Sequence, residues 1–257
     1  MDLQIIGPQD RFPKARLTQP PPFGYIHLAA AVEPPIGRAP FPRSSSGKSE
    51  LLQRLKDLAG MLTRHESVQR ATVYRAVVVP PVGGYASLPG VHPARFDVSV
   101  LIETPTLDDI GAVRDSEPYQ ELHGALAQRS TDLHVMMARC AKSLQDVDKS
   151  RPGLFLFNFF VAEDPKIALA LWDYLAGWYW AQTGLHNSTV LQPFDVPAVQ
   201  GAEGQRDDYA FVNHARWDYG LPGLILQQFT KPSFRSYVLD NLLINRTGSM
   251  PVLYRLA

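Results

Sequence analysis

The chain has 257 residues, of which 45% are hydrophobic and 10% aromatic, and its 25 Lys plus Arg balance its 25 Asp plus Glu. This composition is sufficient for a packed core and excludes disorder for most of the chain. A formal net charge of zero gives no electrostatic reason to expect nucleic acid or an anionic membrane surface as a partner. We therefore expect a partner that is bound locally and by shape.

Cysteine content and the apolar runs indicate the cellular compartment of the protein and whether it crosses a membrane. Cys140 is the only cysteine of the sequence, so no internal disulfide can form, which suits a reducing compartment. Residues 1–4 lack the basic stretch and apolar core of a secretory signal. The longest apolar runs, 154–162 and 167–181, are interrupted and shorter than the about 20 residues that cross a bilayer. We expect a cytoplasmic protein without a membrane span.

The N-terminal part predicts an arm, a strand and a helix. Residues 1–23 contain five prolines among mixed charges, which predicts an extended arm that lies across its own domain. Residues 24–32 (GYIHLAAAV) predict a strand, and the Pro-, Ser- and Gly-rich residues 34–47 predict a loop. Ser46 or Ser49 can cap a helix that runs to about Thr63. Its apolar stripe at helical spacing consists of Leu51, Leu52, Leu55, Leu58 and Leu62.

The rest of the first half completes the order βαββαβ. Strands are predicted at 69–79, 95–103 and 132–141, and two short helices begin near Thr106 and at Pro118. In the strand 95–103, apolar and polar residues alternate, so one face packs on helices and the other points inward. We expect the helix-facing residues to be Phe96, Val98, Val100 and Ile102. The expected inward residues are Asp97, Ser99 and Leu101.

The second half repeats this order after a linker near residues 145–152. A strand is predicted at 154–162, and the following helix begins at Asp164-Pro165 and ends at Gly184. The segments 188–194, 208–217, 232–244 and 249–256 then predict strand, strand, helix and strand. The helix is too apolar to lie on one sheet face with its other side in water, so we expect a second element or a partner to cover it.

The two halves are related by an internal repeat. Ala210 aligns with Phe96, Pro232 with Pro118 and Met250 with Met136, at an offset of 114 in each case (210 − 96, 232 − 118, 250 − 136). Two copies of one supersecondary unit can cover each other's apolar sheet faces. We therefore expect an arm over residues 1–23, a first repeat over 24–145 and a second over 153–257.

Two βαββαβ units joined head to tail resemble the ferredoxin-like dimeric α/β-barrel superfamily. The element order, the repeat register and the Pro-led helices that begin SEPYQELHGAL and TKPSFRSYVLD carry the resemblance, which covers residues 24–257. It implies an α+β fold in which two antiparallel sheets close into one intrachain barrel. The superfamily includes cofactor-independent oxygenases of aromatic polyketides, cyclases, haem enzymes such as chlorite-dismutase-like and dye-decolourising peroxidases, aldoxime dehydratases and proteins of no known activity. The fold alone therefore does not select a reaction.

The resemblance implies a ligand inside the barrel, lined by the sheet faces opposite the helices. The repeat register sends Phe211, Asn213, Ala215 and Trp217 inward, but one β-bulge would exchange this set for His214 and Arg216, so both sets stay open. A buried amide needs a hydrogen-bond partner, from the protein or from a ligand, and Asn158 is the lone polar residue of a Phe-rich strand. The candidate catalytic residues are Asp97, Asn158, Asn213 and His214. The candidate ligand-binding residues are His134, Phe157, Phe211 and Trp217.

Three functional hypotheses follow. The first is a cofactor-independent enzyme, or a binder, of an apolar or aromatic metabolite, working as an oxygenase, cyclase or isomerase does. The second is a haem protein with His134 or His214 as axial ligand. The third is an assembly protein or homodimer that packs through the aromatic helix 164–183. Large inward side chains such as Phe157 and Trp217 can also simply fill the barrel.

Three other candidate motifs, for phosphate binding, metal binding and nucleophilic catalysis, lack the residue spacing that their chemistry requires. The segment 44–49 (SSSGKS) resembles the end of a phosphate-binding loop, but Pro42 stands where the first glycine belongs, so capping of the following helix is the simpler interpretation. The seven histidines show no metal-ligand spacing, so no protein metal site is expected. His134 and Cys140 are about 20 Å apart along one strand, too far for a nucleophile and base pair.

Overall fold

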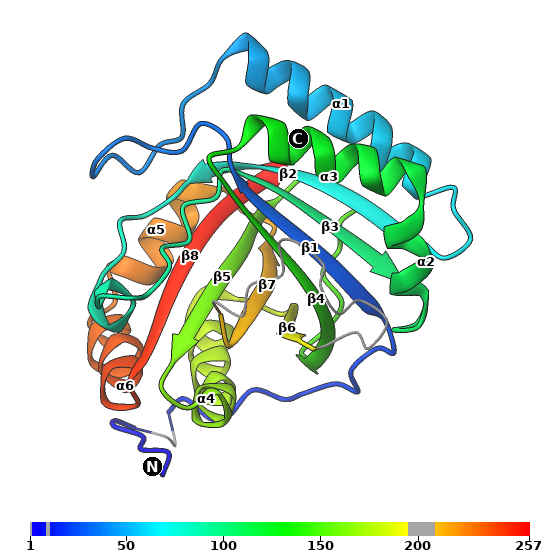
Figure 1. Ribbon diagram of the computed structural model, residues 1–257. Coiled ribbons are helices and arrows are strands. Elements are labelled where there is room, and N and C mark those ends of the chain that lie inside the picture. The colour runs from blue at the N-terminus through cyan, green and yellow to red at the C-terminus, as the bar shows by residue number, and fades with distance from the viewer. Residues whose placement is uncertain (1, 9–10, 195–208) are drawn as a thin grey trace.

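The computed structural model describes residues 2–8, 11–194 and 209–257, and its strands close into one barrel (Figure 1). The order around the barrel is β1-β3-β2-β8-β5-β7-β6-β4, and all neighbouring strands are antiparallel. The strands are β1 (Gly24–Ala31), β2 (Arg70–Val78), β3 (Val98–Thr104), β4 (Asp132–Ser143), β5 (Leu154–Ala162), β6 (Ser188–Pro193), β7 (Phe211–Trp217) and β8 (Thr247–Leu256). The predicted α+β fold with two βαββαβ repeats in one intrachain barrel is confirmed.

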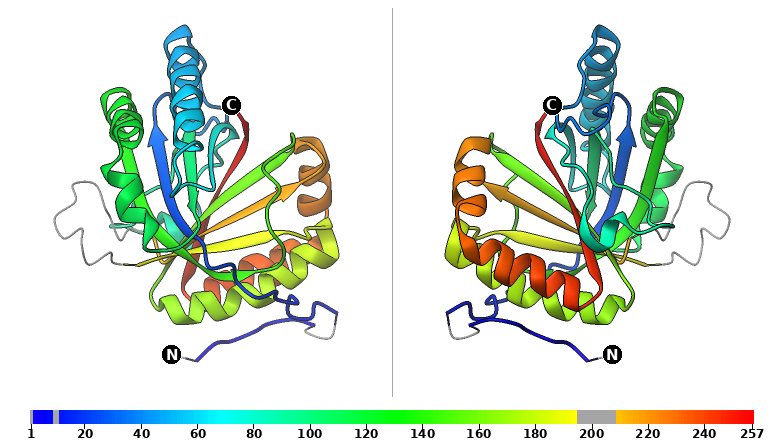
Figure 2. Two further views of the ribbon diagram at one scale, coloured as in Figure 1. Left: turned by 90° about the vertical axis from the view of Figure 1, so that its right-hand side faces the viewer. Right: turned by 90° about the vertical axis from the view of Figure 1, so that its left-hand side faces the viewer.

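Helices cover the outside of the barrel in two groups (Figure 2). The first half supplies α1 (Ser46–Leu62), α2 (Asp109–Asp115) and α3 (Glu117–Arg129). The second half supplies α4 (Pro165–Thr183), α5 (Leu221–Phe229), a π-helical segment η3 (Phe234–Leu239) and α6 (Asp240–Ile244), and a 3₁₀ turn η1 (Gly84–Ser87) lies between β2 and β3. The barrel joins its halves through the pairs β2–β8 and β4–β6, so the sheet has no open edge.

The leucine stripe of α1 forms as the periodicity predicts. Leu51, Leu55, Leu58 and Leu62 are at most 5% exposed and pack on the outer face of the first half-sheet. Each such burial contributes about 1.5–3 kcal/mol. Ser45 caps the helix by accepting a hydrogen bond from the Lys48 amide. The Lys48 ammonium forms a buried ion pair with Asp97, so the SSSGKS segment is a helix cap and not a phosphate site.

The N-terminal arm covers α4, as its apolar character requires. Phe12 is 1% exposed, and the Ala15 amide donates to the Asp173 carbonyl at 2.9 Å. The Pro13 carbonyl lies so close to α4 that a Cβ at Gly177 would collide with it. The arm runs past α4 in Figure 1. The described residues of this segment thus pack against the second half of the chain, through Asp173 of α4 and through Asn241 and Asn245.

The aromatic face of α4 is occupied by the chain itself. Trp172 and Trp178 are 2% and 0% exposed, and the Trp178 indole donates to Ser233 Oγ at 3.1 Å. Of the large aromatic residues at the end of this helix, Trp180 remains 52% exposed. The helix ends at Gly184, whose φ of 63° is the left-handed conformation that glycine adopts most easily. Trp172 and Trp178 are therefore not available to a partner protein.

The side chains of β7 point to the opposite faces from those expected from the 114-residue offset. Val212 lies in the barrel interior, whereas Phe211, Ala215 and Trp217 pack on the helix side. Strand β3 begins at Val98 and β7 begins at Phe211, an offset of 113 in place of 114. Because side chains alternate between the two faces of a strand, this shift of one residue exchanges the two faces of β7. Met136 and Met250 keep the offset of 114 and both point inward. One residue of length difference between the repeats therefore reverses the faces of one strand.

The start of β3 also departs from strict alternation. Val98, Val100 and Ile102 face the helices and Leu101 faces inward, as predicted. Phe96 is an interior residue, and the Asp97 carboxylate is turned toward α1. That carboxylate accepts hydrogen bonds from the amides of Val32 at 2.7 Å and Glu33 at 2.9 Å, and these bonds break the alternation before Val98.

No helix of the described part of the chain is both long and apolar enough to cross a membrane.

Candidate functional site

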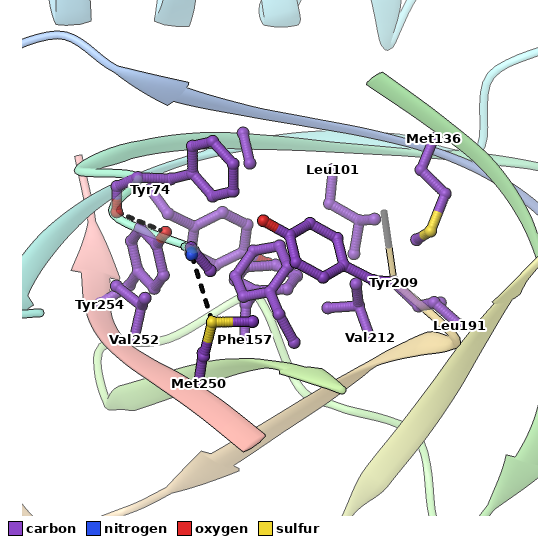
Figure 3. Close-up of a cluster of buried hydrophobic side chains, with 14 of the residues drawn as sticks. Tyr74, Leu101, Met136, Phe157, Leu191, Tyr209, Val212, Met250, Val252 and Tyr254 are labelled. Carbon is purple, nitrogen blue, oxygen red and sulfur yellow. Dashed lines mark hydrogen bonds between the residues drawn. The ribbon is translucent and has the colours of Figure 1, made fainter. Parts of the chain in front are cut away.

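The barrel interior is filled with aromatic side chains (Figure 3). Phe157 lies between two imidazole rings, with centroids 4.5 Å from His27 and 4.2 Å from His214 and interplanar angles of 21° and 12°. Tyr74 meets Phe157 edge-on at 5.2 Å. Offset stacking of this kind adds about 0.5–1.5 kcal/mol per pair to the burial of the rings. Phe157 therefore occupies the place where a ligand ring was expected.

Burial inside the barrel favours the neutral forms of His27 and His214. His214 Nδ1 donates to the Leu156 carbonyl at 3.0 Å, so its Nε2 accepts from the Tyr74 hydroxyl at 3.4 Å. His27 Nε2 shares a hydrogen bond of 2.9 Å with Ser99 Oγ. Burial, and to a smaller extent His134, lowers the pKa of His27 to about 3. Burial, and then the positive charge of Lys149, lowers the pKa of His214 well below its usual value.

His134 and Cys140 also face the interior, but no contact joins the two side chains to each other within the described residues. His134 packs edge-on against Tyr209 with centroids 4.9 Å apart. Cys140 belongs to the interior apolar cluster, and burial raises the pKa of its thiol to about 12. A thiol with this pKa is inert as a nucleophile at neutral pH.

The remaining predicted site residues lie outside the barrel, beneath α4. Asn213 Oδ1 accepts from the Trp172 indole at 3.1 Å and from Ser188 Oγ at 2.6 Å. Asn158 lines the same slot of about 40 Å³, and its Oδ1 has no partner among the described residues. Phe211 stacks on Phe160 at 4.4 Å, and the Trp217 indole donates to Thr183 at 3.2 Å. The structure therefore does not bring Asn158 and Asn213 together with His214.

These contacts do not fit a haem. Both ring nitrogens of His214 are engaged, and the ring is stacked on Phe157 at 4.2 Å and lies parallel to Phe155. A macrocycle at His214 would have to displace Phe157 and Tyr74 from a close-packed interior. His134 is also enclosed by aromatic rings, with the Tyr209 centroid at 4.9 Å and the Phe96 centroid at 6.1 Å. We derive no reaction step through a haem.

Haemin added to the purified protein should therefore give no Soret band in a visible absorption scan. The physical reason is that neither His134 nor His214 has space for a porphyrin plane. A sharp Soret band that His214→Ala or His134→Ala abolishes would contradict this packing.

A buried ion pair closes one end of the barrel, and the sequence pattern did not indicate it. Lys149, in the segment expected to be a linker, places its ammonium 3.0 Å from the Glu103 carboxylate, and both side chains are at most 5% exposed. Val147 of the same segment is fully buried in the interior cluster. Burial raises the pKa of Glu103, and Lys149 opposes that rise. Residues 147–149 therefore plug the barrel.

The opposite end of the barrel opens into a concavity of about 570 Å³, which we call the mouth. Among the described residues, its walls come from the loop before β3, the end of β5, the start of α4, the end of β6 and the residues before β7. The lining includes Tyr85, Val91, His92, Val161, Pro165, Gln192, Pro193 and Tyr209. Tyr209 also belongs to the interior cluster, so it separates the mouth from the packed interior. A volume of this size suits a small organic molecule.

The mouth contains a histidine paired with a carboxylate. His92 Nε2 lies 2.7 Å from Asp132 Oδ2, and their side chains are 26% and 22% exposed. A carboxylate holds the Nε2 proton of a neutral imidazole in place, which leaves Nδ1 as the basic atom. In the described part of the chain, His92 Nδ1 has no hydrogen-bond partner. The Tyr209 hydroxyl donates to the His92 carbonyl at 3.4 Å and ties the two residues together.

Sequence reasoning missed this pair because the two residues belong to different elements. His92 lies in the Pro- and Gly-rich loop after residue 80, and Asp132 is the first residue of β4. The single available signal was a lone histidine in a long loop, since loops carry functional residues more often than core elements do.

The comparisons with known proteins agree on the fold. A solved anthrone oxidase-like protein superposes with a TM-score of 0.61 at 13% identity, over 91% of each chain. The chain has the ferredoxin-like dimeric α+β-barrel fold. A solved monooxygenase-like protein of Fusobacterium nucleatum superposes with a TM-score of 0.52 at 6% identity, over 93% of this chain and 95% of that one. No protein-family model and no curated protein matches the sequence. At these identities the likeness establishes the fold and not the reaction.

Proposed function

We propose that this protein is a cofactor-independent enzyme that abstracts a proton from an apolar or aromatic metabolite bound in the mouth of the barrel. The single observation that carries the proposal is the His92–Asp132 pair, 2.7 Å apart, in the wall of a 570 Å³ concavity. The proposal places the catalytic role at His92 and Asp132 instead of at Asp97, Asn158, Asn213 and His214. It also places the ligand at the mouth and not in the filled interior.

The walls of the mouth suit a ligand with a flat apolar body and a polar edge. Tyr85, Val91, Val161 and Tyr209 offer apolar or aromatic surface, while Gln192 offers an amide. Such a mixture of apolar walls and few polar groups is typical of small-molecule sites. Because the protein has no net charge, binding gains little from long-range attraction and depends on this local fit.

Proton abstraction is the common first step of the reactions expected from the sequence. An isomerase moves a proton, a cyclase forms an enolate, and a cofactor-independent oxygenase forms a substrate anion that reacts with oxygen. His92 Nδ1 is the atom that accepts the proton, and Asp132 stabilises the imidazolium that forms. The name of the anthrone oxidase-like neighbour points to aromatic ketones of the anthrone type, whose acidic C–H group lies between two aryl rings and is conjugated with the carbonyl.

The test uses proton exchange, because it detects the base without the full reaction. Anthrone in deuterated buffer, under argon, exchanges its acidic C–H protons, and we expect the protein to accelerate this exchange as followed by proton NMR. His92→Gln should lower the protein-dependent rate by about 100-fold or more. Asp132→Asn should lower it by a smaller factor, because it removes the orienting charge but not the base.

The matched control is His123→Gln on α3, which removes a histidine that does not line the mouth. Its exchange rate should equal that of the unaltered protein. Exchange that persists in His92→Gln, or that falls equally in His123→Gln, would refute the assignment of the base. A parallel oxygen-electrode trace with anthrone in air then distinguishes an oxygenase from an isomerase or cyclase.

A further inference from the structure

A second cleft, of about 380 Å³, lies at the end of the barrel opposite the mouth. Its walls are Gly153 before β5, Asp218 to Gly220 between β7 and α5, Arg75 of β2 and Arg255 of β8. The proton-abstraction chemistry proposed for the mouth makes no use of this cleft.

Two arginines face each other across the strand pair that forms one wall. Arg75 and Arg255 are directly opposite in the β2–β8 ladder, and both are exposed. Within the described residues neither forms an ion pair. Like charges directly opposite in an antiparallel pair destabilise it. An anion between the two guanidinium groups would convert this repulsion into attraction.

A third arginine lies buried behind the cleft. Arg216 is 3% exposed, and its guanidinium contacts Asp218 at 2.8 Å and the Pro152 carbonyl at 2.7 Å. Its Nε has no partner among the described residues, although a buried charged donor is costly to leave unpaired. The Nε lies next to Gly153 of the cleft wall, where an added Cβ would come within 2.5 Å of it.

The local charges leave an excess of positive charge. Asp148 pairs with Arg151 at 2.7 Å, and Asp218 pairs with Arg151 and Arg216. The four arginines of this region are Arg75, Arg151, Arg216 and Arg255, and the two acids are Asp148 and Asp218. Their sum is 4 − 2, or two positive charges, and these correspond to the unpaired Arg75 and Arg255.

The N-terminus of α5 lies on the same side and offers the Leu221 amide, since Pro222 has no N–H and the Gly223 amide donates to the Gly220 carbonyl at 3.0 Å. Gly220 is the N-cap and lines the cleft, and no side chain caps the first turn, which also contains no acidic residue. An added Cβ at Gly220 would lie 4.0 Å from the Arg255 guanidinium, so the arginine and the helix start are neighbours. The positive end of the helix dipole favours anions here.

We propose that this cleft binds an oxyanion, a phosphate or carboxylate group, held by Arg75 and Arg255 and by the N-terminus of α5. The planar guanidinium fork matches both groups with two parallel hydrogen bonds. The ligand class is therefore a small phosphorylated or carboxylated molecule, or the free ion. The cleft and the mouth lie at opposite ends of the barrel, so variants in one leave the other intact.

The experiment is isothermal titration calorimetry with sodium phosphate and, in a separate arm, with sodium acetate, at constant ionic strength in chloride. We expect saturable binding in at least one arm, and the tighter arm identifies the preferred group. Arg75→Gln and Arg255→Gln should each weaken that binding by about tenfold. Arg64→Gln, which removes one charge from an exposed position at the end of α1, should change it by less than twofold.

Thermal melting provides a second readout that a structural role would not reproduce. In chloride alone, Arg255→Gln should melt no lower than the unaltered protein, since it removes a repulsion. With saturating ligand the order should reverse, because only the unaltered protein is stabilised by binding. Absence of saturable binding in both arms, or an equal loss in Arg64→Gln, would overturn the proposal.

Discussion

Phe157→Ala should lower the free energy of unfolding by about 4 kcal/mol. Phe157 is fully buried and stacked between His27 and His214, with Tyr74 and Tyr254 edge-on to its ring. Truncation leaves a ring-sized cavity whose aromatic walls belong to strands of a closed barrel, so they cannot collapse to fill it. Urea unfolding followed by circular dichroism measures the change.

The control for this variant is Phe229→Ala in α5. Phe229 is 64% exposed, so the same truncation should change the free energy of unfolding by about 0.5 kcal/mol or less. If Phe157→Ala were no more destabilising than Phe229→Ala, the interior would be open and the ring replaceable. That result would return the ligand to the barrel interior.

Lys149→Met should destabilise the protein by about 3 kcal/mol at pH 7. The change leaves the Glu103 carboxylate buried without its partner at 3.0 Å, and the remaining basic neighbour, Arg70, is 4.0 Å away. The double variant Lys149→Met, Glu103→Gln should recover most of the loss, because no buried charge is then left unpaired. Urea unfolding of the two variants and the unaltered protein gives the comparison.

The loss of unfolding free energy caused by Lys149→Met should also depend on pH, and the titration of Glu103 determines whether it grows or shrinks as pH rises. Burial raises the pKa of this carboxyl in the folded state, so the folded state binds the proton more tightly than the unfolded state does. The contribution of Glu103 to stability is therefore full below its unfolded pKa and is lost as pH rises through the folded pKa. Lys149 lowers that folded pKa, and its removal raises it further.

The loss caused by Lys149→Met should consequently be smaller at pH 5 than at pH 7. Comparing variant and unaltered protein at the same pH cancels the titration of other groups. Equal losses at both values would mean that Glu103 is neutral, or solvated, in the folded protein.

The architecture was predictable because each element has a local signal. The leucine spacing of α1, the Asp164-Pro165 start and Gly184 end of α4, and the alternation of β3 depend on residues a few positions apart. The order βαββαβ, taken twice, carried the resemblance to the tandem α/β barrels, and that resemblance implied a closed barrel. The excess apolar surface of α4 also predicted its cover, which the arm around Phe12 supplies.

The site was not predictable to the same degree, for three physical reasons. A one-residue change in repeat length moved Asn213 outward and His214 inward, and a weak repeat does not reveal such a change. An inward phenylalanine such as Phe157 has the same pattern whether it lines a cavity or fills it. His92 approaches Asp132 only through the course of a loop, which has no periodicity.

Histidine-selective NMR of the protein titrated with anthrone under argon tests the central claim most directly. His92→Gln identifies the His92 ring signals by their loss. If the substrate binds at the mouth, the His92 signals shift with a saturable profile, while those of His27 and His214 stay in place because Phe157 fills the space between them. Shifts at His27 and His214 with an unchanged His92 would contradict the account and place the ligand inside the barrel.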